Sequence, residues 1–360
     1  MLRQLSPAIG RLDLTPRTPR PSTVIKTVST ERRSAVARVA IAAACGIALS
    51  TGASADSLAQ PKDRSLEHQA AAYVQFREDV AAIQAEPISS AESTRDAHRR
   101  LSAHNSNDLS AGWVAYAALL AADTQEFADG LKKQVQSRKR RHGLKGRDGL
   151  IAELSANPRF ASELPGADEA VARVLAMAVQ DGKRVVSLGE SFKTQAYAMQ
   201  KTAWGKARIQ SSSARITEAE EFAKNRPTPF APAMPGAADR GVTAPSLASL
   251  NGSWSPEWGA AEGEGEVSEP NAQVIMDRVL ILAARYAIGA TNEKLVAAYA
   301  RNDRSSRCLH MSTLTLKQCI AATRTPYEEA FCLGEHGLND VAGCLGWVAG
   351  PETTKTADAR

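Results

Sequence analysis

Four cysteines lie near the C-terminal end of the sequence, at Cys308, Cys319, Cys332 and Cys344. The midpoint between the outer two falls at 325–326, and so does the midpoint between the inner two. This symmetry predicts an antiparallel hairpin with nested disulfides, in which Cys308 pairs with Cys344 and Cys319 with Cys332. The first arm spaces its cysteines by about three helical turns. The second arm contains three glycines, so we expect it to form two short pieces.

A zinc site is the competing use of four cysteines, but structural zinc sites bring ligands in close pairs and no two of these cysteines are that close. We therefore expect disulfides, with the nested pairing favoured over the sequential one, and predict no metal and no cofactor. The arrangement resembles the twin-cysteine helix hairpins of CHCH proteins, whose outer and inner cysteines pair in the same nested way. Ten and eleven residues separate the cysteines of the two arms, more than in that family. We take the resemblance as shared geometry and not as family membership, and only membership would imply a mitochondrial location.

Glu190 followed by Ser191 resembles the Glu-Ser dipeptide at the catalytic acid of lysozyme-like lytic transglycosylases. This resemblance implies cleavage of peptidoglycan with Glu190 as the acid. Apart from it, we keep as the alternative function an envelope hydrolase, acting on peptidoglycan or another envelope polymer, whose catalytic residues are dispersed in the sequence. No second motif of that family follows, and the sequence has no G-x-S-x-G elbow, H-E-x-x-H pair or P-loop. We expect Glu190 to be a solvated helix residue and predict no catalytic residue.

The six histidines do not fall at metal-ligand spacing on any one predicted helix. His98 and His104 are six residues apart and would lie on different faces. His336 lies between the two cysteines of the second arm, where we expect a loop histidine that caps a carbonyl group.

A basic run follows the third predicted helix, and we expect it to form an exposed loop broken by glycines. Its cations are Arg138, Lys139, Arg140, Arg141, Lys145 and Arg147. Such a run could bind anionic lipid, lipopolysaccharide or another acidic surface of the envelope, and the alternative is a solvated loop.

Trp254 and Trp258 lie in a stretch that is otherwise rich in proline and glycine. They could pack back onto a neighbouring domain, or they could anchor a protein partner in the envelope. We keep both interpretations.

The first 55 residues contain eight Lys or Arg and two acidic residues, whereas the rest of the chain has 36 bases and 37 acids. An apolar segment then ends in the small residues Ala53-Ser54-Ala55. This pattern predicts a signal peptide, 1–55, removed before Asp56. The basic excess therefore reflects targeting, and we expect no nucleic-acid partner and no permanent membrane span after cleavage. The predicted location is periplasmic or secreted, with the mitochondrial intermembrane space as the alternative.

Aromatic residues make up only 5% of the chain and alanine is abundant, which favours closely packed helices over a β-sandwich. We predict an all-α protein with a bundle-like helical domain at 56–225 and a helical cystine module at 271–350. Between them, 226–270 contains seven prolines and six glycines and is expected to be a linker. Residues 351–360 are expected to form a disordered tail.

Apolar residues at helical spacing predict a helix over 65–85, and the nearly continuous apolar run at 272–288 predicts another. Asp108 or Ser110 is expected to cap a third helix, and Asn292 to cap the helix that follows the apolar run.

Within the first domain, apolar and small residues alternate at steps of three and four along 171–203. This seam predicts a long helix packed against another helix of the same chain, and a homo-oligomer through the seam is the second option. Taken together, the sequence favours an exported envelope protein with a structural or interaction role. Whether it is an enzyme stays open.

Overall fold

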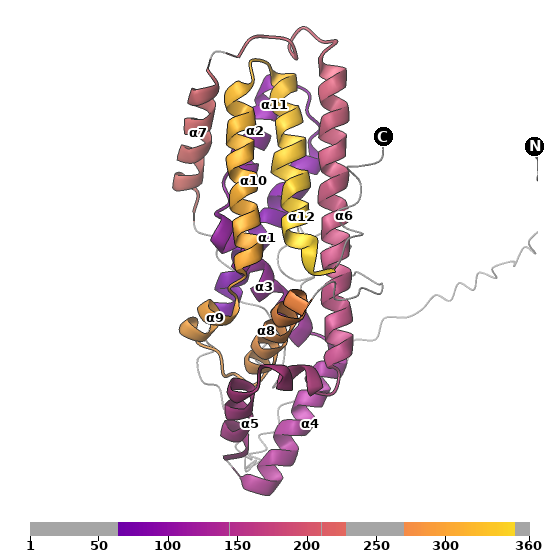
Figure 1. The fold of residues 1–360 in the computed structure, drawn as a ribbon, viewed down its shortest axis with the longest axis vertical. Helices are drawn as coiled ribbons and strands as arrows, with labels where there is room; N and C mark the ends of the chain where they lie inside the picture. Colours follow the sequence, from indigo (N-terminus) through magenta and orange to yellow (C-terminus); the bar gives the residue numbers. More distant parts are fainter. Residues whose placement is uncertain (1–63, 144, 210, 228–269, 350–360) are drawn as a thin grey trace, which may run out of the picture. The chain divides into compact units, whose positions relative to one another are not determined.

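The computed structural model describes residues 64–143, 145–209, 211–227 and 270–349, and every regular element within these ranges is a helix (Figure 1). The all-α prediction is confirmed for this part of the chain. No helix in the described ranges combines the length and hydropathy that crossing a membrane requires.

Before the gap at 228–269 the helices are α1 (Ser65–Ala85), α2 (Ala91–Leu101), α3 (Ser106–Ala122), α4 (Gln125–His142), α5 (Lys145–Ala156), the 3-10 helix η1 (Pro158–Glu163), α6 (Ala167–Met199) and α7 (Ser212–Asn225). After the gap they are α8 (Pro270–Ala287), α9 (Glu293–Tyr299), α10 (Asp303–Ala322), α11 (Pro326–Cys332), the π-helix η4 (Leu333–Asn339), α12 (Asp340–Gly346) and the 3-10 helix η5 (Trp347–Ala349).

Helix α3 forms the centre of the packing because it is apolar on all sides. Every residue from Gly112 to Ala122 is buried, and the helix contacts α1, α6, α8 and α10. A Cβ atom at Gly112 would lie 2.8 Å from the backbone nitrogen of Tyr73, so this glycine lets α1 approach closely.

Helices from both sides of the gap share one hydrophobic cluster. Helix α8, predicted from its apolar run, packs against α3, and its Tyr286 hydroxyl donates a hydrogen bond to Glu67 on α1 (2.8 Å). The helices of the predicted domains 56–225 and 271–350 thus bury their apolar faces against one another within one compact unit. The predicted signal peptide and tail, and nearly all of the predicted linker, lie outside the described residues.

A polar cluster lies inside this core and joins α1, α3 and α6. The hydroxyl of Tyr73 donates to Asp181 Oδ2 (2.7 Å), and the Arg77 guanidinium pairs with the same carboxylate at 3.3 Å and donates to the Tyr116 hydroxyl. All four side chains are buried. Because a buried charge is stable only when it is paired and hydrogen-bonded, Arg77 and Asp181 depend on each other.

The four C-terminal cysteines pair as the symmetry predicts. Cys308 is bonded to Cys344 and Cys319 to Cys332, with Cα atoms 5.4 and 5.7 Å apart. Helix α10 forms one arm of the hairpin, and the turn lies at 323–325, where Glu328 accepts hydrogen bonds from the backbone that opens α11. The nested connectivity is thereby confirmed.

The second arm differs from the prediction of two short pieces, because α11, η4 and α12 form one uninterrupted helical run despite its glycines. Cys332 and Cys344 are twelve residues apart, one more than the cysteines of α10, and a regular α-helix would turn the second cysteine away by about a third of a turn. A π-helical turn closes with i→i+5 bonds and so takes up one extra residue. The π-helix therefore brings both cysteines back to the face that meets α10.

Helix α6 carries the predicted seam, and helices of the same chain fill it. Leu175, Ala178, Val185 and Phe192 are buried, and α6 contacts α11, η4 and α12, which run beside it in Figure 1. The residues that could have formed a homo-oligomer interface thus pack against helices of the same chain. The helix ends at Met199, so Ala203, at the end of the predicted seam, lies beyond it and is exposed.

Several predicted helix ends are corrected. Asn105 caps α3 through its side-chain oxygen, in place of the predicted Asp108 or Ser110, and accepts from the backbone nitrogens of residues 107 and 108. The predicted basic loop at 138–147 is instead the end of α4, a turn at Gly143 and the start of α5. The predicted Asn292 cap of α9 is confirmed, with its side chain accepting from Leu295 (3.0 Å).

Candidate functional site

A cavity of about 840 Å³ opens between α1, the start of α3, the end of α7 and α9. One face of α1 lines it, including His68, Gln69 and Gln75, because residues three or four apart lie on the same side of a helix. His104, in the turn before α3, and Arg226, just after α7, also line the wall, and Asp108 and Glu293 add carboxylates to it. The volume lies in the range of small-ligand sites.

Asp79 lies under this wall and is almost fully buried. His104 Nε2 lies 2.9 Å from Asp79 Oδ2, and the two terminal nitrogens of Arg226 hold both carboxylate oxygens. Arg100 on α2 adds a second guanidinium group at 3.3 Å. A second cavity of about 450 Å³ borders Asp79, Arg100 and Arg226 on the other side. We name Asp79, Arg100, His104 and Arg226 the Asp79 cluster.

The cations around Asp79 decide its protonation. Burial alone would raise the pKa of this carboxyl, but the hydrogen bonds and charges of His104 and Arg226 outweigh burial and hold the pKa below its usual range. Asp79 is therefore ionised at neutral pH.

A carboxylate that binds one ring nitrogen of a histidine orients the imidazole, and in the neutral form of the ring the other nitrogen is a hydrogen-bond acceptor. The ring of His104 also packs edge-on against Phe76, with ring centroids 5.4 Å apart. An imidazole held in this way can accept a hydrogen bond or a proton from a bound molecule. The cavity wall thus has a polar group suited to ligand binding or to general base chemistry.

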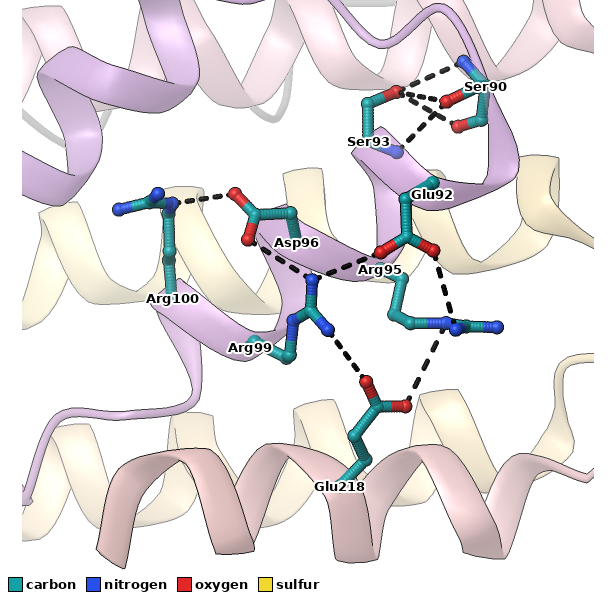
Figure 2. A network of polar contacts seen from close by, with 8 residues as sticks. All are labelled: Ser90, Glu92, Ser93, Arg95, Asp96, Arg99, Arg100 and Glu218. Atoms are coloured by element: carbon teal, nitrogen blue, oxygen red, sulfur yellow. Dashed lines mark hydrogen bonds and ion pairs between the residues drawn. The ribbon is translucent and has the colours of Figure 1, made fainter. Parts of the chain in front are cut away.

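Arg226 reaches Asp79 because it directly follows α7, and α7 is held against α2 by ion pairs (Figure 2). Glu218 of α7 pairs with Arg99 at 2.8 Å and with Arg95 at 3.8 Å. On α2, Arg99 also pairs with Glu92 and Asp96.

Only two residues of α7 are buried, Arg215 and Ala219. Arg215 binds the carboxylate of Glu329 and donates to the Thr323 hydroxyl (2.9 Å), and Glu329 also lies 2.9 Å from His98. Polar contacts therefore hold the helix that positions Arg226.

The predicted anionic-surface residues form the end of the hairpin between α4 and α5. Among Arg138, Lys139, Arg140, Arg141, Lys145 and Arg147, all but the first are exposed. Arg138 is half-buried and pairs with Glu153 of α5. These residues are brought together in space, although not as the loop that the sequence suggested.

Glu190 and His336 do not border either cavity. Glu190 accepts hydrogen bonds from Lys193 (3.0 Å) and Asn339 (2.7 Å), and although burial raises its pKa, these bonds hold it below its usual range. A lowered pKa does not suit the general acid that the lytic transglycosylase resemblance implies. His336 lies in the π-helix rather than a loop, with Nδ1 2.9 Å from Asp340, so its predicted role as a carbonyl cap is wrong.

The remaining predicted sites are the cysteines and the tryptophans. Cys332 and Cys344 are buried, whereas Cys308 is exposed. Trp254 and Trp258 lie outside the described residues. No group of three metal-ligating side chains occurs in the part of the chain that the structure describes.

Sequence reasoning missed the Asp79 cluster. Asp79 is separated from its partners by 21 to 147 residues, and α7, which positions Arg226, was not predicted. The signal that could have found α7 is Ser211, whose side chain caps the helix by accepting from Ala214. In comparisons with known proteins, no family model, curated protein or solved structure matches this chain.

Proposed function

We propose that this chain is an exported helical protein of the cell envelope, periplasmic or secreted, that works by binding a small polar ligand. The single observation that carries the binding role is the cavity beside the Asp79 cluster. Four helical elements border this ligand-sized volume, and α1, the turn before α3 and the residue after α7 supply it with amide, imidazole and guanidinium groups.

The two cystine pairs support the proposed compartment, because disulfides persist in oxidising environments. The mitochondrial intermembrane space is the alternative oxidising compartment. N-terminal sequencing of the exported protein should find Asp56 as the first residue, and thiol alkylation without reductant should label none of the four C-terminal cysteines. A retained segment 37–55 would argue for an anchored protein instead.

The cavity can be tested with a matched pair of substitutions on α9. Ala297 lines the cavity, whereas its exposed neighbour Ala298 does not, so Ala297→Trp should fill the cavity and Ala298→Trp should leave it open. Native mass spectrometry of protein isolated from exporting cells should show an additional bound mass in the wild type and in Ala298→Trp. Absence of this mass in all three proteins, or its presence in Ala297→Trp, would refute the binding proposal.

A hydrolase acting on peptidoglycan or another envelope polymer is the second candidate. The specific observation that favours it is the Asp79–His104 pair, since a buried carboxylate that orients an imidazole is a common general-base arrangement. We expect no soluble fragments when the protein is incubated with purified peptidoglycan. Fragment release that is lost in His104→Gln and kept in His142→Gln would replace the binding proposal with the hydrolase.

A further inference from the structure

The hairpin of α4 and α5 ends in a strongly basic tip, which we define as residues 132–149 (lower end of Figure 1). Eight Lys or Arg and one acid, Asp148, lie within it. The cations are Lys132, Lys133, Arg138, Lys139, Arg140, Arg141, Lys145 and Arg147. All except Arg138 are exposed, so the tip presents a concentrated positive charge to solvent.

Two glycines and one ion pair hold the basic tip in a fixed shape. Gly143 makes the turn with a φ of 60°, a conformation that favours glycine. A Cβ atom at Gly146 would lie 2.5 Å from the backbone carbon of Arg138, so the two helices touch there. The Arg138–Glu153 pair joins them on the next turn. The remaining cations are therefore displayed on a rigid helical hairpin.

The basic tip differs from the arginine cluster of α2 in how its charge is compensated. Arg95, Arg99 and Arg100 all pair with carboxylates, as Figure 2 shows. In the tip, Arg141 and Arg147 make hydrogen bonds to the neutral oxygens of Ser137 and Gly289. Apart from Arg138–Glu153, no ion pair joins a tip cation to a carboxylate of the described residues.

Helix stability does not account for this arrangement. Cations in the last turn of α4 do favour the helix, because the C-terminal end of a helix dipole is negative. Lys145 and Arg147, however, lie in the first turn of α5, where the dipole disfavours positive charge. Close like charges also repel, so a partner of opposite charge explains the concentration better than folding does.

We propose that the basic tip binds the surface of a lipid bilayer that contains anionic phospholipids. Seven exposed cations spread over a protruding turn match an extended layer of anionic headgroups, because each basic residue near such a surface adds to the attraction. The cavity beside Asp79 plays no part in this contact. The proposal of membrane binding would therefore stand even if the cavity bound no ligand.

Vesicle sedimentation tests the proposal with phosphatidylcholine alone and with phosphatidylcholine mixed with phosphatidylglycerol. The full chain and the chain from Asp56 are both measured, because residues 1–55 carry their own basic excess. Both should bind only the mixed vesicles. In the chain from Asp56, the triple variant Lys139→Gln, Arg140→Gln, Arg141→Gln should partition about a hundredfold less well. Raising the salt from about 0.1 M to about 1 M should release the wild type, because screening shortens the reach of the charges.

A matched control removes three exposed cations elsewhere, through Lys201→Gln, Lys206→Gln and Arg208→Gln. These residues follow the C-terminal end of α6, whose 33 residues span about 50 Å, whereas the first turn of α6 meets α4. The control changes the net charge equally and should bind within about twofold of the wild type. An equal loss in both variants, equal binding to neutral vesicles, or no binding by the wild type would overturn the proposal. Far-UV circular dichroism and thermal unfolding should show that both variants fold.

Discussion

Two buried aspartates show how neighbours set the behaviour of the same side chain. Asp79 is surrounded by Arg226, Arg100 and His104, and its pKa lies below the usual range despite burial. Asp181 is also buried, and although Arg77 and Tyr73 lower its pKa, burial outweighs them and raises the pKa to about 6. Asp79 is therefore a carboxylate that binds neighbouring cations, whereas the ionisation of Asp181 destabilises the folded state.

The raised pKa of Asp181 makes a testable contribution to pH dependence. Because its folded pKa lies above the ordinary value of 3.8, the folded state binds the proton more tightly. This contribution to stability is present below about pH 4 and is lost as the pH rises to about 6. Two pKa units correspond to roughly 3 kcal/mol.

Asp181→Asn cannot ionise, so relative to the wild type it should gain about 3 kcal/mol in unfolding free energy between pH 4 and pH 7.5. Urea denaturation at the two pH values measures the difference. Because only the change in this difference with pH is used, any constant cost of the lost Arg77 contact cancels. If the unfolding free energies of Asp181→Asn and the wild type differ by the same amount at both pH values, the raised pKa is contradicted.

Helix α6 crosses the second arm of the disulfide hairpin, α11 to α12, at two facing glycines. A Cβ atom at Gly334 would lie 2.7 Å from the backbone oxygen of Gly189, and one at Gly189 would lie 2.8 Å from the oxygen of Gly334. Backbone atoms cannot move aside as a flexible side chain can. The two helices must therefore separate if either glycine gains a side chain.

Gly334→Ala should lower the unfolding free energy by about 1–3 kcal/mol, because it overpacks this contact. Gly149→Ala in α5 is the matched control, since nothing lies within 4 Å of a Cβ atom there. That control should leave stability unchanged or raise it by up to about 1 kcal/mol. Chemical denaturation of both variants decides it, and equal effects would mean that the helix crossing tolerates a methyl group.

Helix α7 should respond to the loss of one carboxylate. Glu218→Gln removes the ion pairs to Arg99 and Arg95, and a contribution of up to about 1 kcal/mol should appear as roughly fivefold faster amide exchange across 212–225. Hydrogen exchange measured by mass spectrometry gives the rate. Glu221→Gln, an exposed residue on the same helix, should leave the exchange rate unchanged.

The elements show what the sequence can and cannot predict. Helix α1 follows from apolar periodicity, helix α8 from a nearly continuous apolar run, and the Asn292 cap from one local side chain. The start of α3 was misplaced because Asn105, Asp108 and Ser110 are all competent caps within a few residues, and packing selects among them. Helix α7 has no apolar stripe to detect, because ion pairs with partners distant in sequence hold it. The Asp79 cluster could not be predicted for the same reason.

For the whole molecule, the shared core changes what the disulfides stabilise. A cystine module with its own core would unfold alone after reduction, leaving the first helices folded. The described helices instead bury α3 against α8 and α10, and α6 against α11 and α12. Loss of the hairpin should therefore weaken the packing of the helices that precede the gap.

Reduction should shift one cooperative thermal transition rather than create two. The closed loops span sequence separations of 36 and 13 residues, and each bridge should contribute about 3 kcal/mol or somewhat more by restricting the unfolded chain. Calorimetry with and without reductant, together with far-UV circular dichroism, measures the shift. A transition that moves while a second stays in place would show that the two predicted domains unfold independently.

Because of the π-helix between α11 and α12, the number of residues between two cysteines does not alone decide whether they lie on the same face of the arm. One arm of the hairpin returns to its face in eleven residues and the other in twelve, yet the cysteines of each arm face those of the other. A chain without the extra residue could keep both bridges with a regular helix in place of the wide turn. A difference of one residue in cysteine spacing therefore need not change which cysteines pair, provided that a π-helical turn takes up the extra residue.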